Sequence, residues 1–536
     1  MNKFFYYNAL CSGSNTQSVF SIDPYVTAIK ELLVSELKQV VYYIEKLRSF
    51  DFDMSSYTDK VIEFITVLIV NLDFTKENTF IIIEDLYNNK KMLEKMYISA
   101  CEKADLEPDL FSENTGNLSS KDIILKALNE KEKDIKTSGL NLKTDKNKKY
   151  LYEIMMNIVL NACNKLIELK SYGISLENAK NNVLSFLNTT NIPSLSDDEL
   201  KNIIRNFAKN NYETTKILYN TLMKRFGPVS KTKVDVCEKE GQAVLVSGSG
   251  FDELEKILSA VKGLNINVYS YQEMISAFQY EKLRQHPNFA GHYTKSTNNI
   301  QSDFADFPGP VFVTKNSMPK IDVIRGRIFT STKYPAFGIS KIENDNFEPL
   351  VKSALETKGF LNNFTLKTIN IGYNKNEIEN GISEIITKFK NKEIKNVIII
   401  GITDKFNIID DYISEFLNLN HENNYIISFT EELKQNNFMH VNSYLDFGIL
   451  YEIVEKLIEQ ESEIRNHISI FLADCNNTTI SHIFNFIHLE VRNIFLGPCC
   501  PNVVSPVLVE GLDSMFNIKT LTTPKEDLEL INEKGG

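Results

Sequence analysis

The sequence predicts an α/β multidomain protein: an N-terminal antiparallel helical bundle followed by two Rossmann-like α/β domains with parallel sheets. Between about 24 and 222, apolar residues recur at intervals of three and four, which is the period of an amphipathic helix. After Gly227 and Pro228, short apolar runs alternate with helical patterns, and this order builds parallel sheets. The chain of 536 residues also exceeds the roughly 250–300 residues that one core supports, so we expect several domains.

The helical bundle is predicted over 1–226. Its first long helix is expected at 24–47, because Asp23 suits a helix cap and Pro24 suits the first helical turn. The charged stretch 129–149 is expected to be an exposed linker within the bundle. Further helices are expected at 59–72, 78–104, 149–169 and 197–226.

The two α/β domains are predicted over 227–365 and 366–536. In the first, an apolar run at 242–248, a helical pattern and a second apolar run at 266–271 predict a strand–helix–strand unit. Further strands of this domain are expected at 309–316 and 327–331. In the second domain, buried parallel strands are expected at 395–404, 423–430, 467–474 and 491–498.

Composition argues against several classes of protein. The chain is 43% hydrophobic and 24% charged, as an ordinary globular protein is. Its net charge of −11 disfavours nucleic acid and anionic membranes as partners, because both bind basic patches. No apolar run is long enough to cross a bilayer, and the N-terminus lacks the pattern of a signal peptide. Seven cysteines without a CxxC motif argue against a disulfide framework, so we expect a cytoplasmic protein.

Several blocks of sequence share their order and spacing with one known family. The block 493–531 contains Leu-Gly-Pro-Cys-Cys-Pro followed by Ser-Pro, and further blocks cover 286–314 and 326–342. These blocks resemble the hybrid cluster protein family, also called prismane proteins or hydroxylamine reductases, which is distantly related to carbon monoxide dehydrogenase. The resemblance covers the whole chain, densely from about 240 onward, and implies a prismane-like fold.

The resemblance also implies where the family's metal ligands would lie. Members bind a hybrid iron–sulfur–oxygen cluster, and at the aligned positions they have a His where this chain has Ser249 and a Cys where it has Ser317. Only the carboxylate of Glu273 matches, so Glu273 is the one residue of this pocket expected to be able to bind metal. Three further cysteines of the family fall on or beside Ile402, Thr430 and Leu450. A carboxylate ligand and a nearby lysine of the family fall on Asn476 and Thr478, which complete this former cluster pocket.

The cysteines that open the family's sequences are replaced as well. They hold a cubane-type cluster, and the alignment places Phe5, Asn8, Ser14 and Phe20 on the four positions. Cys11 is nearby but alone, and a single thiolate does not hold such a cluster. Because thiolate sulfur is the main ligand of iron–sulfur clusters, we expect this chain to bind no cofactor.

Glu273 has two interpretations. It is a vestigial ligand or a proton-handling carboxylate at a strand end, where parallel sheets place their ligand crevices. Alternatively it is a remnant of the family that hydrogen-bonds the backbone or Ser249, and this second interpretation is the one we prefer.

The cysteines give weaker candidates. Cys499 and Cys500 suggest redox chemistry, but two packed thiols are the simpler interpretation, because a disulfide between neighbours is strained. Cys475 is either a reactive thiol or a buried residue at a strand end, and we prefer the latter. The remaining cysteines are expected to fill cores: Cys101, Cys163 and Cys237.

The histidines and one glycine-rich run are weaker still. His286 and His292 flank a turn, while His482 and His488 are six residues apart and do not share a helix face. The Ser-Gly-Ser-Gly run at 247–250 could bind an anion at a helix start, but it is not a complete phosphate-binding motif.

The leading hypothesis is a member of the hybrid cluster fold that has lost its iron–sulfur clusters and its reductase activity. Such a protein would be retained for binding or assembly, with another protein or a second copy of itself as the partner. One alternative is a hydroxylamine or nitric oxide reductase that holds iron in another way. The other is a small-molecule binder that uses the former cluster pocket near Glu273.

Overall fold

The protein was analysed as a computed structural model, which divides into two compact units. The helical unit comprises the described residues of 21–214 and 313–346, and the α/β unit those of 215–312 and 347–536. The structure describes residues 24–70, 76–111, 146–192, 194–295, 300–315, 324–401, 408–419, 423–429, 437–441, 447–472, 477–496 and 506–534.

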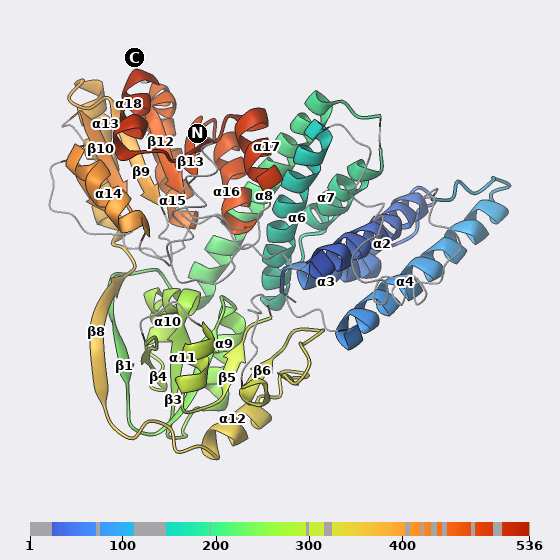
Figure 1. The fold of residues 1–536 in the computed structure, drawn as a ribbon, viewed down its shortest axis with the longest axis horizontal. Helices are drawn as coiled ribbons and strands as arrows, with labels where there is room; N and C mark the ends of the chain where they lie inside the picture. The colour runs from blue at the N-terminus through green and yellow to red at the C-terminus, as the bar shows by residue number, and fades with distance from the viewer. Residues whose placement is uncertain are drawn as a thin grey trace. The chain divides into compact units, whose positions relative to one another are not determined.

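The helical unit is built from long amphipathic helices (Figure 1). Helix α2 packs against α4, α3 and α7, and α3 packs against α6. The apolar stripe of α2 explains this packing, because Leu37, Val41 and Ile44 recur on one face and are at most 2% exposed. The bounds are α2 Pro24–Arg48, α3 Ser55–Val70, α4 Lys76–Lys103, α6 Lys146–Ser171, α7 Glu177–Asn188 and α8 Asp197–Phe226, which continues into the α/β unit.

The expected helices of the bundle are present among the described residues, and the first begins at Pro24 as predicted. The exposed linker predicted at 129–149 lies mostly outside the described residues, but its last four residues already belong to α6. The helical unit also contains two short parallel strands, β6 Ile328–Thr330 and β7 Ser340–Lys341. Strand β6 confirms the strand expected at 327–331.

The first sheet of the α/β unit has the order β5-β2-β3-β4-β1-β8. Strands β2, β3, β4 and β1 pair in parallel, whereas β8 joins β1 in the antiparallel direction. The strands are β1 Thr232–Glu238, β2 Gln242–Ser247, β3 Ile266–Tyr271, β4 Phe289–His292, β5 Val311–Val313 and β8 Phe364–Ile371. The helices are α9 Phe251–Ala260, η2 Gln272–Gln279, α10 Glu281–Arg284, α11 Ile300–Asp306 and α12 Glu348–Leu355.

The second sheet has the order β11-β10-β9-β12-β13-β14, and every pair in it is parallel. The strands are β9 Asn396–Gly401, β10 Asn424–Ser428, β11 Phe438–His440, β12 Ile468–Leu472, β13 Asn493–Leu496 and β14 Lys519–Thr520. The helices are α13 Lys375–Lys390, α14 Ile408–Leu419, α15 Phe447–Gln460, α16 Asn477–His488, α17 Pro506–Phe516 and α18 Pro524–Lys534.

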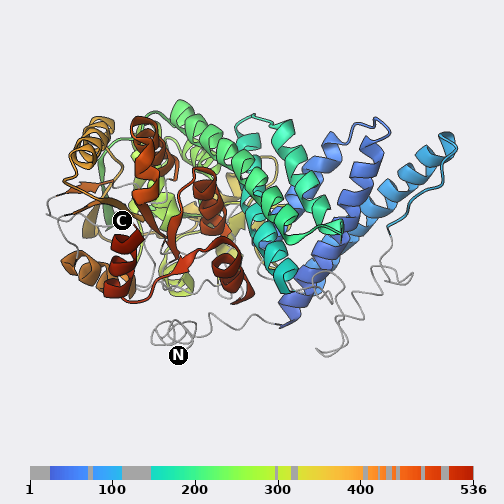
Figure 2. The ribbon, with the colours of Figure 1, turned by 90° about the horizontal axis from the view of Figure 1, so that it is seen from above.

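Helices α14 and α18 cover one face of the second sheet, and the ribbon in Figures 1 and 2 shows them beside its strands. Ile398 and Ile400 of β9 pack there with Phe416 of α14 and Phe471 of β12, all at most 3% exposed. The four strands predicted for this region are confirmed. The predicted fold class, helices followed by parallel α/β sheets, is therefore confirmed, while the three-domain boundaries stay a prediction.

Gly359 gives a test of how tightly the first sheet is closed. Its φ is +66°, and a Cβ there would lie 1.8 Å from the carbonyl oxygen of Gly241, whose backbone hydrogen-bonds Phe360. We predict that Gly359→Ala lowers the free energy of unfolding by more than about 2 kcal/mol. The strain of a positive φ at alanine and the clash of its Cβ with the backbone of Gly241 both contribute to this loss.

The matched control is Gly263→Ala, where φ is +80° but nothing lies within 4 Å of the added Cβ. This substitution should lower the free energy of unfolding by only about 1 kcal/mol, which is the cost of placing alanine in the left-handed conformation. Urea unfolding measures both variants, and equal losses would contradict the close approach at Gly359.

Candidate functional site

Ser249 and Glu273 lie at the same edge of the first sheet. Strands β2 and β3 are parallel neighbours in which Ser247 pairs with Tyr271, so the two candidates follow at equivalent positions. Ser249 is exposed in the loop before α9, and Glu273 is partly exposed in the first turn of η2. Both therefore lie beyond the carboxyl ends of adjacent strands, the usual place of a ligand crevice.

The start of α9 is already occupied by negative charge. Asp252 and Glu253 stand in its first turn and are 1% and 2% exposed. The amino group of Lys256 lies 3.7 Å from the Asp252 carboxylate. Buried carboxylates at the positive end of a helix take the place that an anion would use. The Ser-Gly-Ser-Gly run thus does not favour an anion, and the sequence analysis missed these two acidic residues although they directly follow it.

Leu450 is part of an apolar core, although the resemblance places a cysteine at or beside it. It belongs to α15, is 2% exposed, and its Cδ2 lies 3.7 Å from the Cβ position of Gly401 at the end of β9. On α15, Phe447 stacks face to face on His482 of α16, with ring centroids 3.4 Å apart. Side chains of α15 and α16 thus fill the space between these helices.

A buried polar network accompanies this packing. The hydroxyl of Tyr451 hydrogen-bonds Nδ1 of His482 and accepts a hydrogen bond of 2.8 Å from Asn485. All three side chains are at most 3% exposed. Thr478, one turn before His482 on α16, is exposed. His482 is thus engaged within the core, and it forms no metal pair with His488.

The described residues do not fit a thiolate-held cluster. Ser249, Leu450 and Thr478 supply no sulfur, and Leu450 has no ligand atom at all. Within the described ranges, no group of three or more His, Cys, Asp or Glu side chains is placed to hold a metal ion. The other candidates lie outside the described residues, so their place in one pocket stays a prediction: Ser317, Ile402, Thr430, Asn476, Phe5, Asn8, Ser14, Phe20, Cys11, Cys475, Cys499 and Cys500.

The remaining described cysteines and histidines have ordinary surroundings. Cys101, Cys163 and Cys237 are buried free thiols, and burial raises the pKa of both Cys163 and Cys237. His292 is buried at the end of β4, where its Nδ1 lies 2.8 Å from the Ser270 hydroxyl of β3. His286 is only partly exposed.

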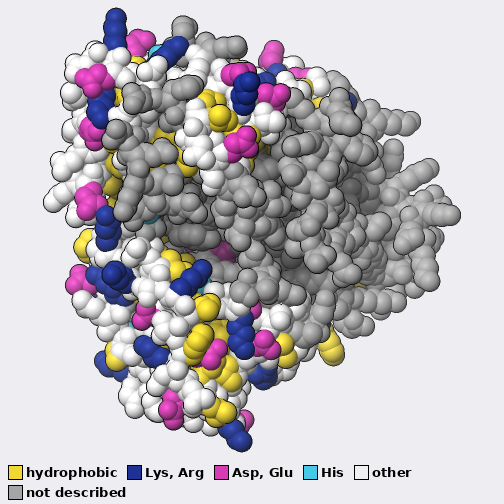
Figure 3. Space-filling model, turned by 60° about the vertical axis from the view of Figure 1, so that its left-hand side comes forward, with side chains coloured by type: hydrophobic (Ala, Val, Ile, Leu, Met, Phe, Trp, Pro, Cys, Tyr) yellow, Lys and Arg dark blue, Asp and Glu magenta, His cyan; other side chains and the backbone are white. Residues whose placement is uncertain are grey.

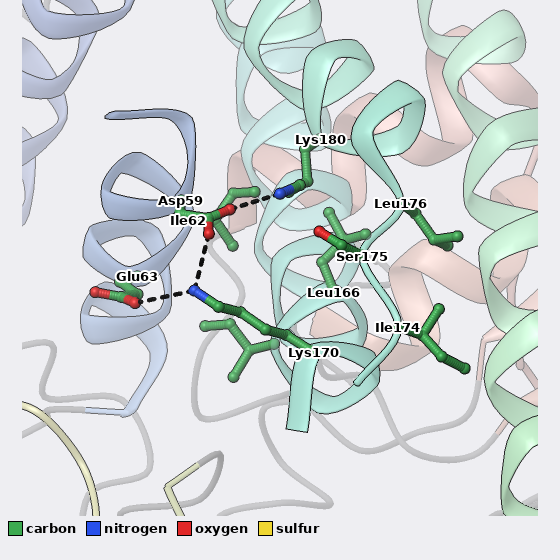
Figure 4. Close-up of a pocket in the computed structure, with 10 residues that line it drawn as sticks. Asp59, Ile62, Glu63, Leu166, Lys170, Ile174, Ser175, Leu176 and Lys180 are labelled. Carbon is green, nitrogen blue, oxygen red and sulfur yellow. Dashed lines mark hydrogen bonds and ion pairs between the residues drawn. The ribbon is translucent and has the colours of Figure 1, made fainter. Parts of the chain in front are cut away.

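The helical unit contains a pocket that the sequence did not predict (Figure 4). The carboxylate of Asp59 on α3 lies 2.9 Å from the amino group of Lys170 and 2.7 Å from that of Lys180. Partial burial raises the pKa of Asp59, but hydrogen bonds from Lys180 and Lys170 outweigh it and lower the pKa below its usual value. The acidic and basic side chains of this pocket form ion pairs with one another. We therefore interpret the pocket as a structural clamp that joins α3, α6 and α7.

No described helix is long and apolar enough to cross a membrane. Comparison with known proteins then gives the class of protein. The model of the Prismane/CO dehydrogenase family matches residues 9–430, and this chain belongs to that family. The recognition made from the sequence is therefore confirmed.

The curated relatives agree with this class. The chain is 28% identical over 327 residues to a hydroxylamine reductase of Methanocella arvoryzae and 28% identical over 320 residues to one of Thermodesulfovibrio yellowstonii. Each match covers 57% of this chain and 59% of the relative, so the chain spans about three-fifths of the length of these relatives.

Among solved structures, carbon monoxide dehydrogenase IV from Carboxydothermus hydrogenoformans has a TM-score of 0.49 at 12% identity, covering 96% of this chain and 87% of that one. A nickel-free carbon monoxide dehydrogenase from Thermococcus sp. AM4 has a TM-score of 0.46 at 12% identity, covering 94% and 85%.

Family membership corrects the expectation that the chain binds no cofactor, and that expectation is wrong. Hydroxylamine reductases of this family carry iron–sulfur clusters, and the chain belongs to the same family. An iron–sulfur cluster is thus the cofactor class that the family implies, although Ser249 and Leu450 do not fit its ligand set.

His292 predicts a pH dependence of stability. The pKa of His292 is lowered from 6.5 to about 4, because burial and, to a smaller extent, the charge of Lys367 outweigh a hydrogen bond with the backbone of Ser270 that raises it. Between these two values the unfolded chain binds a proton that the folded protein does not, so stability falls as pH decreases through this window. At pH 5 the loss from this residue is about 2 kcal/mol relative to pH 7.

The check is urea unfolding of the wild type and of His292→Gln at both pH values. The difference between pH 7 and pH 5 should shrink by about 2 kcal/mol in the variant. An unchanged difference would show that His292 already titrates normally in the folded protein.

The clamp at Asp59 predicts a loss of stability when its charge is removed. In Asp59→Asn, the nearly buried Lys180, 7% exposed, keeps only Glu177 as its ionic partner. We expect the free energy of unfolding to fall by about 1–3 kcal/mol.

The matched control for the clamp is Glu63→Gln. Glu63 lies 3.7 Å from Lys170 and its side chain is 39% exposed, so its loss should cost less than about 0.5 kcal/mol. If thermal unfolding shows equal effects for the two variants, the clamp interpretation is wrong.

Proposed function

We propose that this chain is a member of the Prismane/CO dehydrogenase family that does not reduce hydroxylamine and instead acts by binding another protein chain. The observation that carries the proposal is the packing of Leu450. It fills a core position between α15 and the end of β9, where the resemblance places a thiolate ligand or its neighbour. A buried leucine cannot exchange electrons or hold iron.

The packing around Leu450 also disfavours the small-molecule alternative. A binding pocket needs a cavity with a few converging polar groups. Phe447 and His482 are stacked in contact, and the polar atoms of Tyr451 and Asn485 bond one another. Around Leu450, the described part of the former cluster pocket thus contains packed side chains.

The site at the first sheet supports the same proposal. Glu273 keeps a carboxylate at the edge, but its neighbour in the parallel register is Ser249, a neutral side chain with no metal preference at neutral pH. Asp252 and Glu253 add buried negative charge beside it. This set of oxygen atoms differs in kind from the His and thiolate donors that the family places there.

The rival proposal is hydroxylamine reduction, which the names of the curated relatives favour. In that case an iron–sulfur cluster would supply the electrons, and residues other than Ser249 and Leu450 would hold it. The negative charge of the chain and the absence of a membrane-spanning helix among its described residues support a protein partner in the cytoplasm over nucleic acid or membrane.

The test is a reductase assay of the full chain purified without oxygen, beside the Thermodesulfovibrio yellowstonii relative as the positive control. With a chemical one-electron donor and hydroxylamine, we expect turnover by the relative and none by this chain above the rate without protein. Iron and acid-labile sulfide are measured in the same samples.

Glu273→Gln separates the two proposals further. If Glu273 is a remnant, the variant keeps the iron content and the unfolding temperature of the wild type. Turnover by the wild type together with loss of iron and turnover in Glu273→Gln would establish the reductase and overturn the proposal.

A further inference from the structure

Two long helices of the helical unit end in the same way, and each end carries an exposed apolar side chain. After α2, the amide of Phe52 hydrogen-bonds the carbonyl of Leu47 at 3.3 Å, and after α4, the amide of Leu106 hydrogen-bonds that of Cys101 at 2.9 Å. These are the bonds of a Schellman ending, in which the residue before the apolar one has a left-handed backbone. Phe52 is 40% exposed and Leu106 is 57% exposed, so neither is buried against its own helix.

Aspartate occupies both of the left-handed positions. The φ of Asp51 is +61° and that of Asp105 is +56°. Glycine adopts this conformation without strain, whereas residues with a Cβ are strained in it. A negative charge is also unfavourable at the carboxyl end of a helix. Asp51 and Asp105 therefore oppose local stability while they place a carboxylate beside each exposed apolar side chain, and such conflicts are typical of functional surfaces.

Side-chain contacts hold the two helix ends beside each other. The rings of Phe50, in the turn after α2, and of Tyr97, near the end of α4, have centroids 6.1 Å apart. The chain turns back after α4 (Figure 1), and the carboxylate of Asp109 lies 2.7 Å from the amino group of Lys46 on α2. Leu110, which follows Asp109, is 44% exposed. Three exposed apolar side chains therefore lie at this end of the helical unit, and we call them the tip patch: Phe52, Leu106 and Leu110.

The surroundings of the tip patch are acidic. Residues 51–53 and 102–110 are all exposed, and they contain six acidic side chains but a single basic one, Lys103. The acidic side chains are Asp51, Asp53, Glu102, Asp105, Glu107 and Asp109. Lys46 neutralises Asp109, so a clear excess of negative charge surrounds the apolar side chains.

We propose that the tip patch binds an amphipathic segment of another protein that carries lysine or arginine beside its apolar residues. The inference rests on the proposed function, protein binding, and deepens it by giving the chemistry of the partner. Covering the exposed apolar area contributes affinity, and opposite charge around it contributes association rate and selectivity. Because backbone hydrogen bonds already fix both helix ends, little conformational entropy is lost on binding.

The α/β unit also exposes apolar side chains, but the charges around them are mixed. Leu355 at the end of α12 is 50% exposed, and the exposed residues near it in sequence include Lys352, Glu356 and Lys358. On the face that Figure 3 shows, hydrophobic side chains likewise lie among both basic and acidic ones. The combination of apolar side chains with a single sign of charge thus distinguishes the tip patch from this surface.

The probe for the test is a synthetic fluorescent peptide of about 18 residues, with leucines at intervals of three and four and lysines elsewhere. Fluorescence anisotropy measures its binding to the full chain. We expect saturable binding with a dissociation constant below about 100 μM. A second peptide with serine in place of every leucine should bind at least about tenfold more weakly, because it keeps the charge but cannot cover the tip patch.

A pair of matched double variants locates the binding. Leu106→Gln with Glu107→Lys removes an apolar side chain and reverses a charge, and should raise the dissociation constant at least about tenfold. The control is Leu355→Gln with Glu356→Lys, which makes the same changes at the same dipeptide in the α/β unit and should leave binding unchanged. All four side chains are exposed, so both variants should keep the unfolding temperature of the wild type.

Asp105→Gly separates binding from a merely structural role. Glycine relieves the left-handed strain and removes a charge from the end of α4, so the unfolding temperature should rise. Loss of the carboxylate should at the same time weaken binding of the leucine–lysine peptide by about twofold to fivefold, as expected for one exposed ion pair. A residue kept for stability alone would not give these opposite changes.

The proposal is overturned if the wild type binds the leucine–lysine peptide no more tightly than the Leu106→Gln, Glu107→Lys variant does, or if the serine peptide binds equally well. Sedimentation of the chain without peptide tests another occupant. A dimer that this variant dissociates would place a second copy on the tip patch and would also overturn the proposal.

Failure here is distinct from failure of the proposed function. Turnover of hydroxylamine refutes the non-reductase role whether or not the peptide binds. A chain that lacks turnover and does not bind the peptide refutes only the basic partner at the tip patch.

Discussion

The burial of Leu450 against the end of β9 is the constraint on which the rest of the site depends. A thiolate at such a position must face a cluster, whereas a leucine must face other apolar atoms, and one backbone cannot satisfy both. Phe447, Tyr451 and His482 are arranged accordingly, as a stacked and hydrogen-bonded layer between α15 and α16. The second sheet is held by this layer and by the isoleucine-rich strands behind it, with no metal required for its packing.

The strands of the second sheet account for its stability. Parallel strands such as β9 and β12 are buried on both faces, and their stability comes from apolar burial and backbone hydrogen bonds. Membership of the Prismane/CO dehydrogenase family is therefore compatible with the side chains of Ser249 and Leu450, which supply no sulfur.

Much of the fold could be predicted from the sequence, because long helices and buried parallel strands leave strong patterns. Strands β1, β4 and β8 were missed for physical reasons: β1 alternates charged with apolar residues, β4 has only four residues, and β8 is exposed over most of its length. At the site, the positions of Ser249 and Glu273 followed from the strand ends. The buried Asp252 and Glu253 and the pairing of Ser270 with His292 did not, because they depend on tertiary contacts that no local pattern encodes.

The most direct test of the central claim is iron-edge anomalous diffraction from crystals of the protein purified without oxygen. The account predicts no iron bonded to the carboxylate of Glu273 and none between Leu450 and Gly401, wherever else in the chain a cluster is held. An anomalous peak within bonding distance of a Glu273 oxygen would contradict it and restore the family's site.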